Sequence, residues 1–322
     1  MNDSTTFSES DELKADEKRP DVTEVPTSPV ISKSEDTDDN NETEVGETQP
    51  IVVKQVETSA ADKESPRLSF AKRCDLGAVR ERNEDSCLVF TSDTGGHFKM
   101  IPFGLYIVAD GMGGHADGHV ASSIASRVAS QYILENVFLP MLHTTATVNQ
   151  IPIQEVLSNA VQAANTAVYE TDPEIDSGTT LTIALILGRR LHVAHVGDSR
   201  LYLQSEDRFE AVTNDHSLVQ RLQDVGQLTA EEATMYRYRN VLLRAVGQGE
   251  EVEIDTYMKL LPKKGKLLLC SDGLCGLVTD NIIREIMDRD LPLQETADGL
   301  YDAAMTAGGY DNITALVVDF VL

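Results

Sequence analysis

The sequence has few of the features that mark zinc sites, membrane spans or secreted proteins. Its four cysteines, Cys74, Cys87, Cys270 and Cys275, form neither CxxC pairs nor any other zinc-type spacing, so we expect small, mostly buried free thiols. The longest apolar runs, such as Leu181–Leu187, are far shorter than the roughly 20 residues of a membrane helix. No basic segment with an apolar core begins the chain. These absences predict a cytoplasmic protein without a membrane span or a secretory signal.

Basic residues are also scarce, with 27 Lys and Arg against 53 Asp and Glu and a formal net charge of −26. Proteins bind nucleic-acid backbones through clusters of Lys and Arg, so a nucleic-acid partner is not expected. The acidic excess is concentrated in residues 1–67, which hold 18 acidic and 7 basic residues and a single aromatic residue, Phe7. Such a segment cannot bury enough apolar surface to offset its ordering entropy. We therefore expect a disordered acidic tail over 1–67 and one folded domain over 68–322.

Two roles remain open for this acidic tail. It is either a solubilising segment or a regulatory segment that is phosphorylated at threonines beside acidic residues, such as Thr37 and Thr43. The composition alone does not choose between them.

Apolar periodicity divides residues 68–322 into alternating strands and helices. Two consecutive helices precede a run of strands, which is typical of a domain in which helices cover antiparallel sheets. Strands are predicted over 68–74, 87–90, 105–108, 179–187, 191–196, 201–204, 252–260, 266–270 and 313–321, and helices over 118–137, 153–169, 218–225, 229–236, 281–289 and 293–307. Ser217 or Asp215 is expected to cap the helix that begins at Leu218, and His216 between them is interpreted as structural rather than catalytic.

Carboxylates recur at the ends of the predicted strands. Asp110 and Asp272 each follow an apolar strand and precede a glycine, and Asp311 comes just before the last strand. Glu84 and Asp85 lie in the connection between the first two strands. One Asp-Gly pair is more often an ordinary turn, but repeated carboxylates without a thiolate or histidine at ligand spacing favour an oxygen-only site for Mg²⁺ or Mn²⁺.

An arginine accompanies these carboxylates near the start of the domain. Arg80 carries a planar fork of donors suited to two oxygens of a phosphate, although a solvated charged loop is the simpler interpretation of this segment taken alone. Together with the carboxylates, Arg80 predicts metal-assisted hydrolysis of a phosphate ester, in which metal-bound water supplies the nucleophile at neutral pH.

Eight short blocks of this sequence resemble, in order, the metal-dependent protein phosphatases of type 2C, the PPM family of serine/threonine phosphatases. They cover nearly all of residues 68–322, and the GMGGH segment is similar to the bacterial-type branch. The blocks are GAVRERNEDS from Gly77, VADGMGGHADG from Val108, SGTTLT from Ser177, HVGDSR from His195, NDHS from Asn214, RAVG from Arg244, CSDGL from Cys270 and GGYDNIT from Gly308.

The resemblance implies an α+β fold, a four-layer α/β/β/α sandwich with two packed antiparallel sheets flanked by helices. It also implies a centre of two Mn or Mg ions that Asp110 bridges. The Gly111 carbonyl would bind one ion, Asp272 and Asp311 would bind the other, and Glu84 and Asp85 would act through water. Arg80 would hold the substrate phosphate, and Asp176 would join Asp272 at a weaker third ion.

The activity implied by the resemblance is hydrolysis of phosphoserine and phosphothreonine in proteins, paired with a cognate serine/threonine kinase, by a monomeric enzyme. Many eukaryotic members carry a histidine directly after the Asp-Gly pair, whereas this chain has Met112 there and His115 three residues later. A water on the metals would then protonate the leaving group. The alternatives are a catalytically silent module of the same fold that binds a signalling partner, and a phosphatase for small metabolites.

Overall fold

The computed structural model describes residues 65–322 except 94–99, 114–117, 144–150, 172–176 and 207. The predicted tail over 1–67 lies almost wholly outside the described residues, and its disorder stays a prediction. Asp176 and His115 lie outside them as well. Within the described ranges, no helix is long and apolar enough to cross a membrane.

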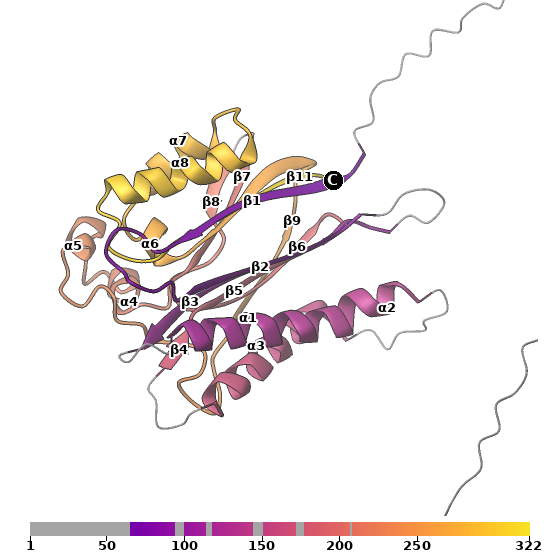
Figure 1. Cartoon of the computed structure of the whole chain (residues 1–322), viewed down its shortest axis with the longest axis horizontal. Helices are drawn as coiled ribbons and strands as arrows, with labels where there is room; N and C mark the ends of the chain where they lie inside the picture. The colour runs from indigo at the N-terminus through magenta and orange to yellow at the C-terminus, as the bar shows by residue number, and fades with distance from the viewer. Residues whose placement is uncertain (1–64, 94–99, 114–117, 144–150, 172–176, 207) are drawn as a thin grey trace, which may run out of the picture. The chain divides into compact units, whose positions relative to one another are not determined.

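Two antiparallel sheets form the centre of the domain (Figure 1). The five-stranded sheet has the order β1-β11-β10-β7-β8, with β1 Arg67–Asp75, β11 Ile313–Val321, β10 Lys264–Cys270, β7 Arg200–Ser205 and β8 Arg208–Ala211. The six-stranded sheet has the order β2-β3-β5-β6-β9, with β2 Asp85–Ser92, β3 Phe103–Gly113, β5 Leu181–Leu187, β6 Arg190–Val196 and β9 Asp255–Leu260, while β4 Ser177–Thr179 pairs with β3.

Helices cover the outer face of each sheet. In Figure 1, α1 (Gly118–Ile133) and α3 (Ile153–Tyr169) lie along the six-stranded sheet, and α7 (Asp280–Met287) and α8 (Leu293–Thr306) lie along the five-stranded sheet. Three buried apolar clusters separate the four layers, one under each helical layer and one between the sheets. The predicted α/β/β/α sandwich is confirmed.

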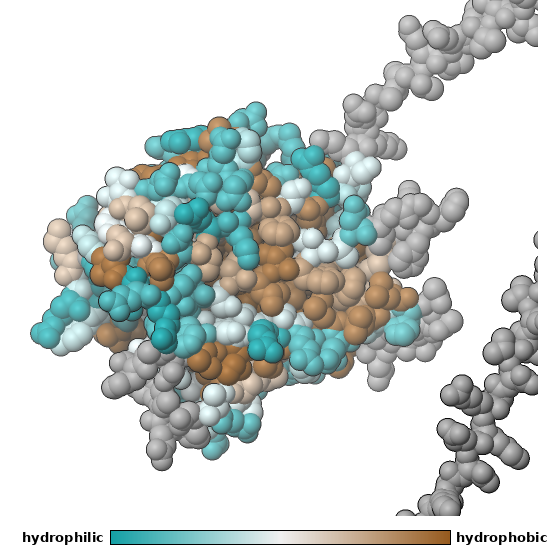
Figure 2. All heavy atoms as spheres, in the orientation of Figure 1, coloured by the Kyte–Doolittle hydropathy of each residue, from teal (hydrophilic) through white to brown (hydrophobic). Residues whose placement is uncertain are grey.

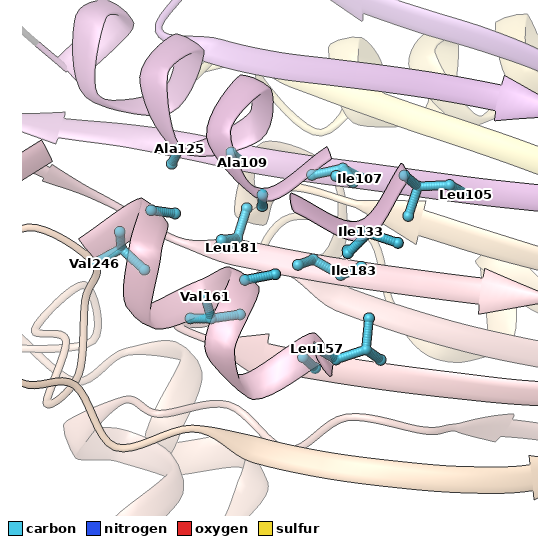
Figure 3. Packing of buried hydrophobic residues seen from close by; sticks show 14 of the residues in the cluster. Leu105, Ile107, Ala109, Ala125, Ile133, Leu157, Val161, Leu181, Ile183 and Val246 are labelled. Atoms are coloured by element: carbon cyan, nitrogen blue, oxygen red, sulfur yellow. The ribbon is translucent and has the colours of Figure 1, made fainter. Parts of the chain in front are cut away.

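The alternation of side chains along β3 explains why this strand is apolar throughout. Leu105, Ile107 and Ala109 pack toward α1 and α3, as Figure 3 shows. Tyr106 and Val108 point the other way, into the cluster between the sheets. Successive side chains of a strand face opposite sides, so a strand covered on both faces needs apolar residues at every position.

The two edge strands β1 and β2 leave part of the apolar core at the surface. Each of them is the last strand of its own sheet among the described residues. Figure 2 shows apolar residues gathered in the middle of the visible face, where Figure 1 places these strands. Phe70 on β1 is 43% exposed.

Several predicted elements differ from the structure in their boundaries. The expected strand over 179–187 is interrupted at Thr180, where β4 ends and β5 begins, and β8 was not predicted. The predicted strand over 252–260 begins only at Asp255. The helix over 118–137 keeps its extent, but its last part is the π-helical segment Leu134–Phe138, which precedes the short α2, Leu139–Met141. Pro140 lacks the N–H that a regular helix would use at this point.

The two helices between β8 and β9 both begin at side-chain caps. Helix α4 (Leu218–Asp224) takes Ser217, not Asp215, as its cap, because the Ser217 hydroxyl accepts from the Gln220 N–H. Helix α5 (Ala230–Thr234) begins with the capping box between Thr229 and Glu232. The short helix α6 (Asp272–Cys275), which follows β10, was not predicted.

Candidate functional site

Asp110 lies inside β3 rather than at the end of a strand, which corrects the prediction. It pairs with Asp85 of β2, and β3 continues to Gly113 because β4 replaces β5 as its neighbour beyond Val108. Thr180, between β4 and β5, forms hydrogen bonds with both the N–H and the carbonyl of Asp110. Its N–H donates to the Asp110 carbonyl at 2.8 Å, and its hydroxyl accepts from the Asp110 N–H at 2.9 Å. The Asp110 carboxylate therefore projects from a fixed backbone.

Gly111 occupies a position where backbone segments meet too closely for a side chain. A Cβ there would lie 2.1 Å from the Gly118 carbonyl oxygen and 2.6 Å from that of Glu84. The Gly111 N–H also donates to the Glu84 carbonyl at 3.1 Å. This glycine therefore brings the start of α1 and the Glu84 segment against β3, beside Asp110.

We expect Gly111→Ala to lower the melting temperature clearly and to reduce metal affinity, because backbone atoms of two segments must move apart to admit the methyl group. The matched control is Gly249→Ala, where the nearest atom to an added Cβ is 3.6 Å away. Thermal denaturation of both variants with and without Mn²⁺ measures the difference. Equal stability of the two variants would contradict the close packing at Gly111.

Arg80 reaches the end of β11, where its Nη2 atom lies 2.7 Å from Oδ2 of Asp311. This contact with Asp311 raises the pKa of Arg80 above its usual value. The side chain of Arg80 is 46% exposed, so its guanidinium remains accessible from solvent. The structure thus brings together the predicted phosphate ligand and one of the predicted metal ligands.

Asn312, which the sequence analysis did not select, holds the Arg80 segment against β11. Its side chain is buried, accepts from the Glu84 N–H at 2.8 Å, and donates to the carbonyls of Leu76 at 3.2 Å and Arg82 at 3.0 Å. Both ends of one amide are therefore used to fix the loop that carries Arg80 and Glu84.

Asp85 begins β2 instead of lying in a loop, and its carboxylate is only half satisfied. Oδ2 accepts from the hydroxyls of Ser271 at 2.7 Å and Thr314 at 2.6 Å, whereas the buried Oδ1 has no hydrogen-bond partner among the described residues. Burial, which outweighs these two hydrogen bonds, raises the pKa of Asp85 to about 7, and the nearby Asp272 and Asp311 charges add to the rise. A cation near Oδ1 would remove this penalty.

Asp110 lies on β3 of the six-stranded sheet, and Asp272 begins α6 just after β10 of the five-stranded sheet, and their carboxyl groups contact each other. Loss of hydration, followed by the charges of Asp85 and Asp272, raises the pKa of Asp110 well above its usual value. Burial and the Asp311 charge likewise raise the pKa of Asp272. Like charges this close are unfavourable unless protons or cations neutralise them.

Asp198 belongs to the same cluster but was missed from the sequence. It follows β6 in the turn that leads to β7, and burial together with the Asp272 charge raises the pKa of Asp198 well above its usual value. The signal was available, since Asp198 follows an apolar strand and adjoins a glycine as Asp110 and Asp272 do. Asp176, which was predicted to join Asp272, is outside the described residues.

The donor set fits hard divalent cations. Its members are carboxylate oxygens and backbone carbonyls, the ligands that Mg²⁺ and Mn²⁺ prefer, and one of them is an unpartnered buried oxygen on Asp85. Within the described ranges, no three His, Cys, Asp or Glu side chains already have the spacing of a metal site.

Comparison with known proteins identifies the family. The family model for protein phosphatase 2C matches residues 79–296. The serine/threonine phosphatase stp of Listeria innocua is 38% identical over 248 residues, which cover 77% of this chain and 94% of that protein. The crystal structure of the serine/threonine phosphatase PstP/Ppp of Mycobacterium tuberculosis is 35% identical, with a TM-score of 0.64, and the match covers 78% of this chain and 98% of that one.

A further structural match holds metal. The catalytic domain of serine/threonine protein phosphatase PstP in complex with two manganese ions is 34% identical, with a TM-score of 0.65 over 80% of this chain and all of that one. Both the sequence and the fold of this chain are similar to those of these relatives. The chain belongs to the protein phosphatase 2C family, the metal-dependent PPM serine/threonine protein phosphatases.

Proposed function

We propose that this phosphatase hydrolyses phosphoserine and phosphothreonine monoesters at a centre of two Mn²⁺ or Mg²⁺ ions held by the carboxylate cluster. The observation that carries the proposal is the approach of Asp110 on β3 to Asp272 at the start of α6, next to the Arg80 and Asp311 pair. Neutralising that much negative charge in a partly buried site calls for divalent cations. The manganese ions in the PstP structure support this assignment.

In this proposal, Asp110 lies between the two ions, the Gly111 carbonyl serves one of them, and Asp272 and Asp311 serve the other. Glu84 and Asp85 stand behind these ligands and bind water or orient it. Asp198 belongs to the same carboxylate cluster and the Asp272 charge raises the pKa of Asp198, so it is the described residue that we assign, in place of Asp176, as the partner of Asp272 at a weaker third ion. When bound, the ions activate a water molecule for attack on phosphorus and neutralise the phosphate.

The chain's own part in catalysis is to position the substrate. Arg80 would direct its fork at two phosphate oxygens, and its contact with Asp311 sets the direction of that fork. Met112, half-buried on β3, has no titratable group, so it cannot protonate the leaving serine or threonine oxygen. We assign this proton to a water in the site.

The partners follow from the reaction. Phosphorylated proteins are the substrates of serine/threonine protein phosphatases, and we propose a cognate serine/threonine kinase that supplies them, a cytoplasmic location and a monomeric state. A catalytically silent binding module is the competing function. The cluster argues against it, because a silent module would have no need to hold several repelling carboxylates together.

The direct test is an assay of the purified full chain on a phosphothreonine peptide. We expect release of phosphate with Mn²⁺, loss of activity with a chelator, and recovery on adding excess Mn²⁺. A small metabolite phosphate and a phosphotyrosine peptide serve as comparison substrates. Mn²⁺ binding without any phosphate release would favour the silent module, and faster hydrolysis of the small metabolite would overturn the assignment of protein substrates.

A further inference from the structure

We propose that His216 is a positioning residue that sets the place of Asp198, by accepting a hydrogen bond from the Gly197 N–H at its Nδ1 atom. The inference rests on the proposed function in one respect, namely that Asp198 contributes to a weak cation site beside Asp272. His216 does not touch substrate or metal in this proposal. It acts through the backbone of the residue before Asp198.

The turn that carries Asp198 has little freedom on its β4–β5 side. Gly197 has a φ of +112°, and a Cβ there would lie 2.5 Å from the Thr180 side chain. Ser199, on the other side of Asp198, shares a 2.8 Å hydrogen bond with the Thr180 hydroxyl. Since Thr180 also holds the backbone of Asp110, one residue ties the two parts of the carboxylate cluster together.

His216 holds the same turn from the opposite side. The Gly197 N–H donates to Nδ1 of His216 at 3.1 Å, and the His216 N–H donates to the Gly197 carbonyl at 2.7 Å. The two residues therefore form a closed pair of hydrogen bonds. His216 is 7% exposed, so water cannot easily replace either bond.

These contacts also fix the tautomer of the His216 ring. A backbone N–H can only donate, so Nδ1 must be the bare acceptor and the neutral ring must carry its proton on Nε2. Nε2 lies 3.4 Å from Oδ2 of Asp255 and 3.2 Å from Nη1 of Arg244, which donates to Oδ1 of Asp255 at 2.9 Å. Arginine has no acceptor, so the Nε2 proton is directed to Oδ2 of Asp255. Burial and the Arg244 charge lower the pKa of His216, which agrees with a ring that stays neutral.

The backbone of His216 joins this turn to the base of the α4–α5 segment. The Leu243 N–H donates to the His216 carbonyl at 2.8 Å, and the Leu218 N–H donates to the Val241 carbonyl at 2.9 Å. A second contact between the same two segments lies two residues earlier on each of them, where Nε2 of His195 on β6 is 3.1 Å from the Asn214 carbonyl oxygen. A displacement of the 214–244 segment would therefore shift Gly197 and, with it, Asp198.

Two substitutions separate the positioning role from general packing. In His216→Asn, Oδ1 stands close to the place of Nδ1 and still accepts from Gly197. In His216→Gln, the polar group stands near the place of Nε2 and leaves the Gly197 N–H without its acceptor. Ser217→Ala is the matched control, since Ser217 caps α4 in the same turn without contacting Gly197.

The measurement is a calorimetric Mn²⁺ titration of the full-length chain, with melting temperatures recorded for every variant. We expect His216→Gln to weaken the lowest-affinity Mn²⁺ site about 10-fold, as losses of partners behind metal ligands do. His216→Asn and Ser217→Ala should stay within about 3-fold of the parent. The tight Mn²⁺ sites should change little in all three variants.

Asp198→Asn separates failure of this inference from failure of the function. Loss of the weak site in Asp198→Asn but not in His216→Gln would overturn the role of His216 and leave the function standing. An unchanged weak site in Asp198→Asn would overturn the assignment of Asp198 and the inference with it. An equal loss of Mn²⁺ affinity at the weak site in His216→Gln, His216→Asn and Ser217→Ala would show a general loosening of the turn. That result would also overturn the role of His216. If His216→Gln fails to fold, a weakened site in His216→Asn decides against the proposal.

Discussion

Asp110→Asn and Asp272→Asn are each expected to lower kcat/KM for Mn²⁺-dependent hydrolysis of a phosphothreonine peptide by more than ~100-fold. Each change removes one negative charge from the proposed two-ion centre while keeping the shape of the side chain. The fold should survive, because both positions are held through their backbones. Thr180 bonds the main chain of Asp110, and the Asp272 carbonyl accepts from the Gly276 N–H at 2.7 Å within α6.

The stability of the metal-free protein should rise in both variants. Asp110 and Asp272 repel each other without a cation, and an amide in place of one carboxylate relieves that repulsion. Asp319→Asn is the matched control, since Asp319 is a β11 carboxylate whose ion pair with Arg67 lies outside the site. Steady-state kinetics, calorimetric Mn²⁺ binding and melting curves are needed together. Near-parent turnover in either cluster variant, with tight Mn²⁺ binding retained, would exclude the two-ion assignment.

Most of the sandwich could be predicted from local patterns. The helix Ile153–Tyr169 and the strand Ile313–Val321 have the predicted boundaries, because their apolar periodicity is long and uninterrupted. The hairpin of β5 and β6 also follows from its sequence, since two apolar strands flank a turn at Gly188 with a φ of +59°. Short elements without such periodicity, such as β8, could not be found in this way.

The site was predictable in its residue types but not in its geometry. Apolar segments followed by Asp and Gly mark Asp110 and Asp272, yet only strand pairing reveals that Asp110 lies within β3 opposite Asp85. The contacts of Asn312 with the Arg80 segment join residues more than 200 positions apart, and no local pattern encodes them. No local pattern encodes the hydrogen bond from the Gly197 N–H to His216 either. This bond places His216, which the sequence indicated to be structural, beside Asp198.

Arg80→Lys is expected to raise KM for a phosphothreonine peptide about 10-fold, and Arg80→Ala to lower kcat/KM by about 100-fold or more. The guanidinium presents parallel donors to two phosphate oxygens, whereas an ammonium acts as a point charge and alanine leaves no positive charge. If Arg80 holds the ground-state phosphate as firmly as the transition state, the loss appears in KM. If it mainly follows the charge that develops during reaction, the loss appears in kcat.

The competing interpretation is that Arg80 only forms a surface ion pair. From the sequence, its neighbours Glu81, Glu84 and Asp85 were the expected partners, whereas the structure pairs Arg80 with Asp311. Such exposed pairs contribute about 0–1 kcal/mol, so their loss would change stability slightly and catalysis hardly at all. Arg67→Ala is the matched control, because Arg67 forms an exposed pair with Asp319 of β11, the strand that follows Asp311. Kinetics at saturating Mn²⁺, with Mn²⁺ affinity measured separately, distinguish a lost phosphate contact from a disturbed Asp311. An Arg80→Ala enzyme with the kcat/KM of the Arg67→Ala control would leave only the surface pair.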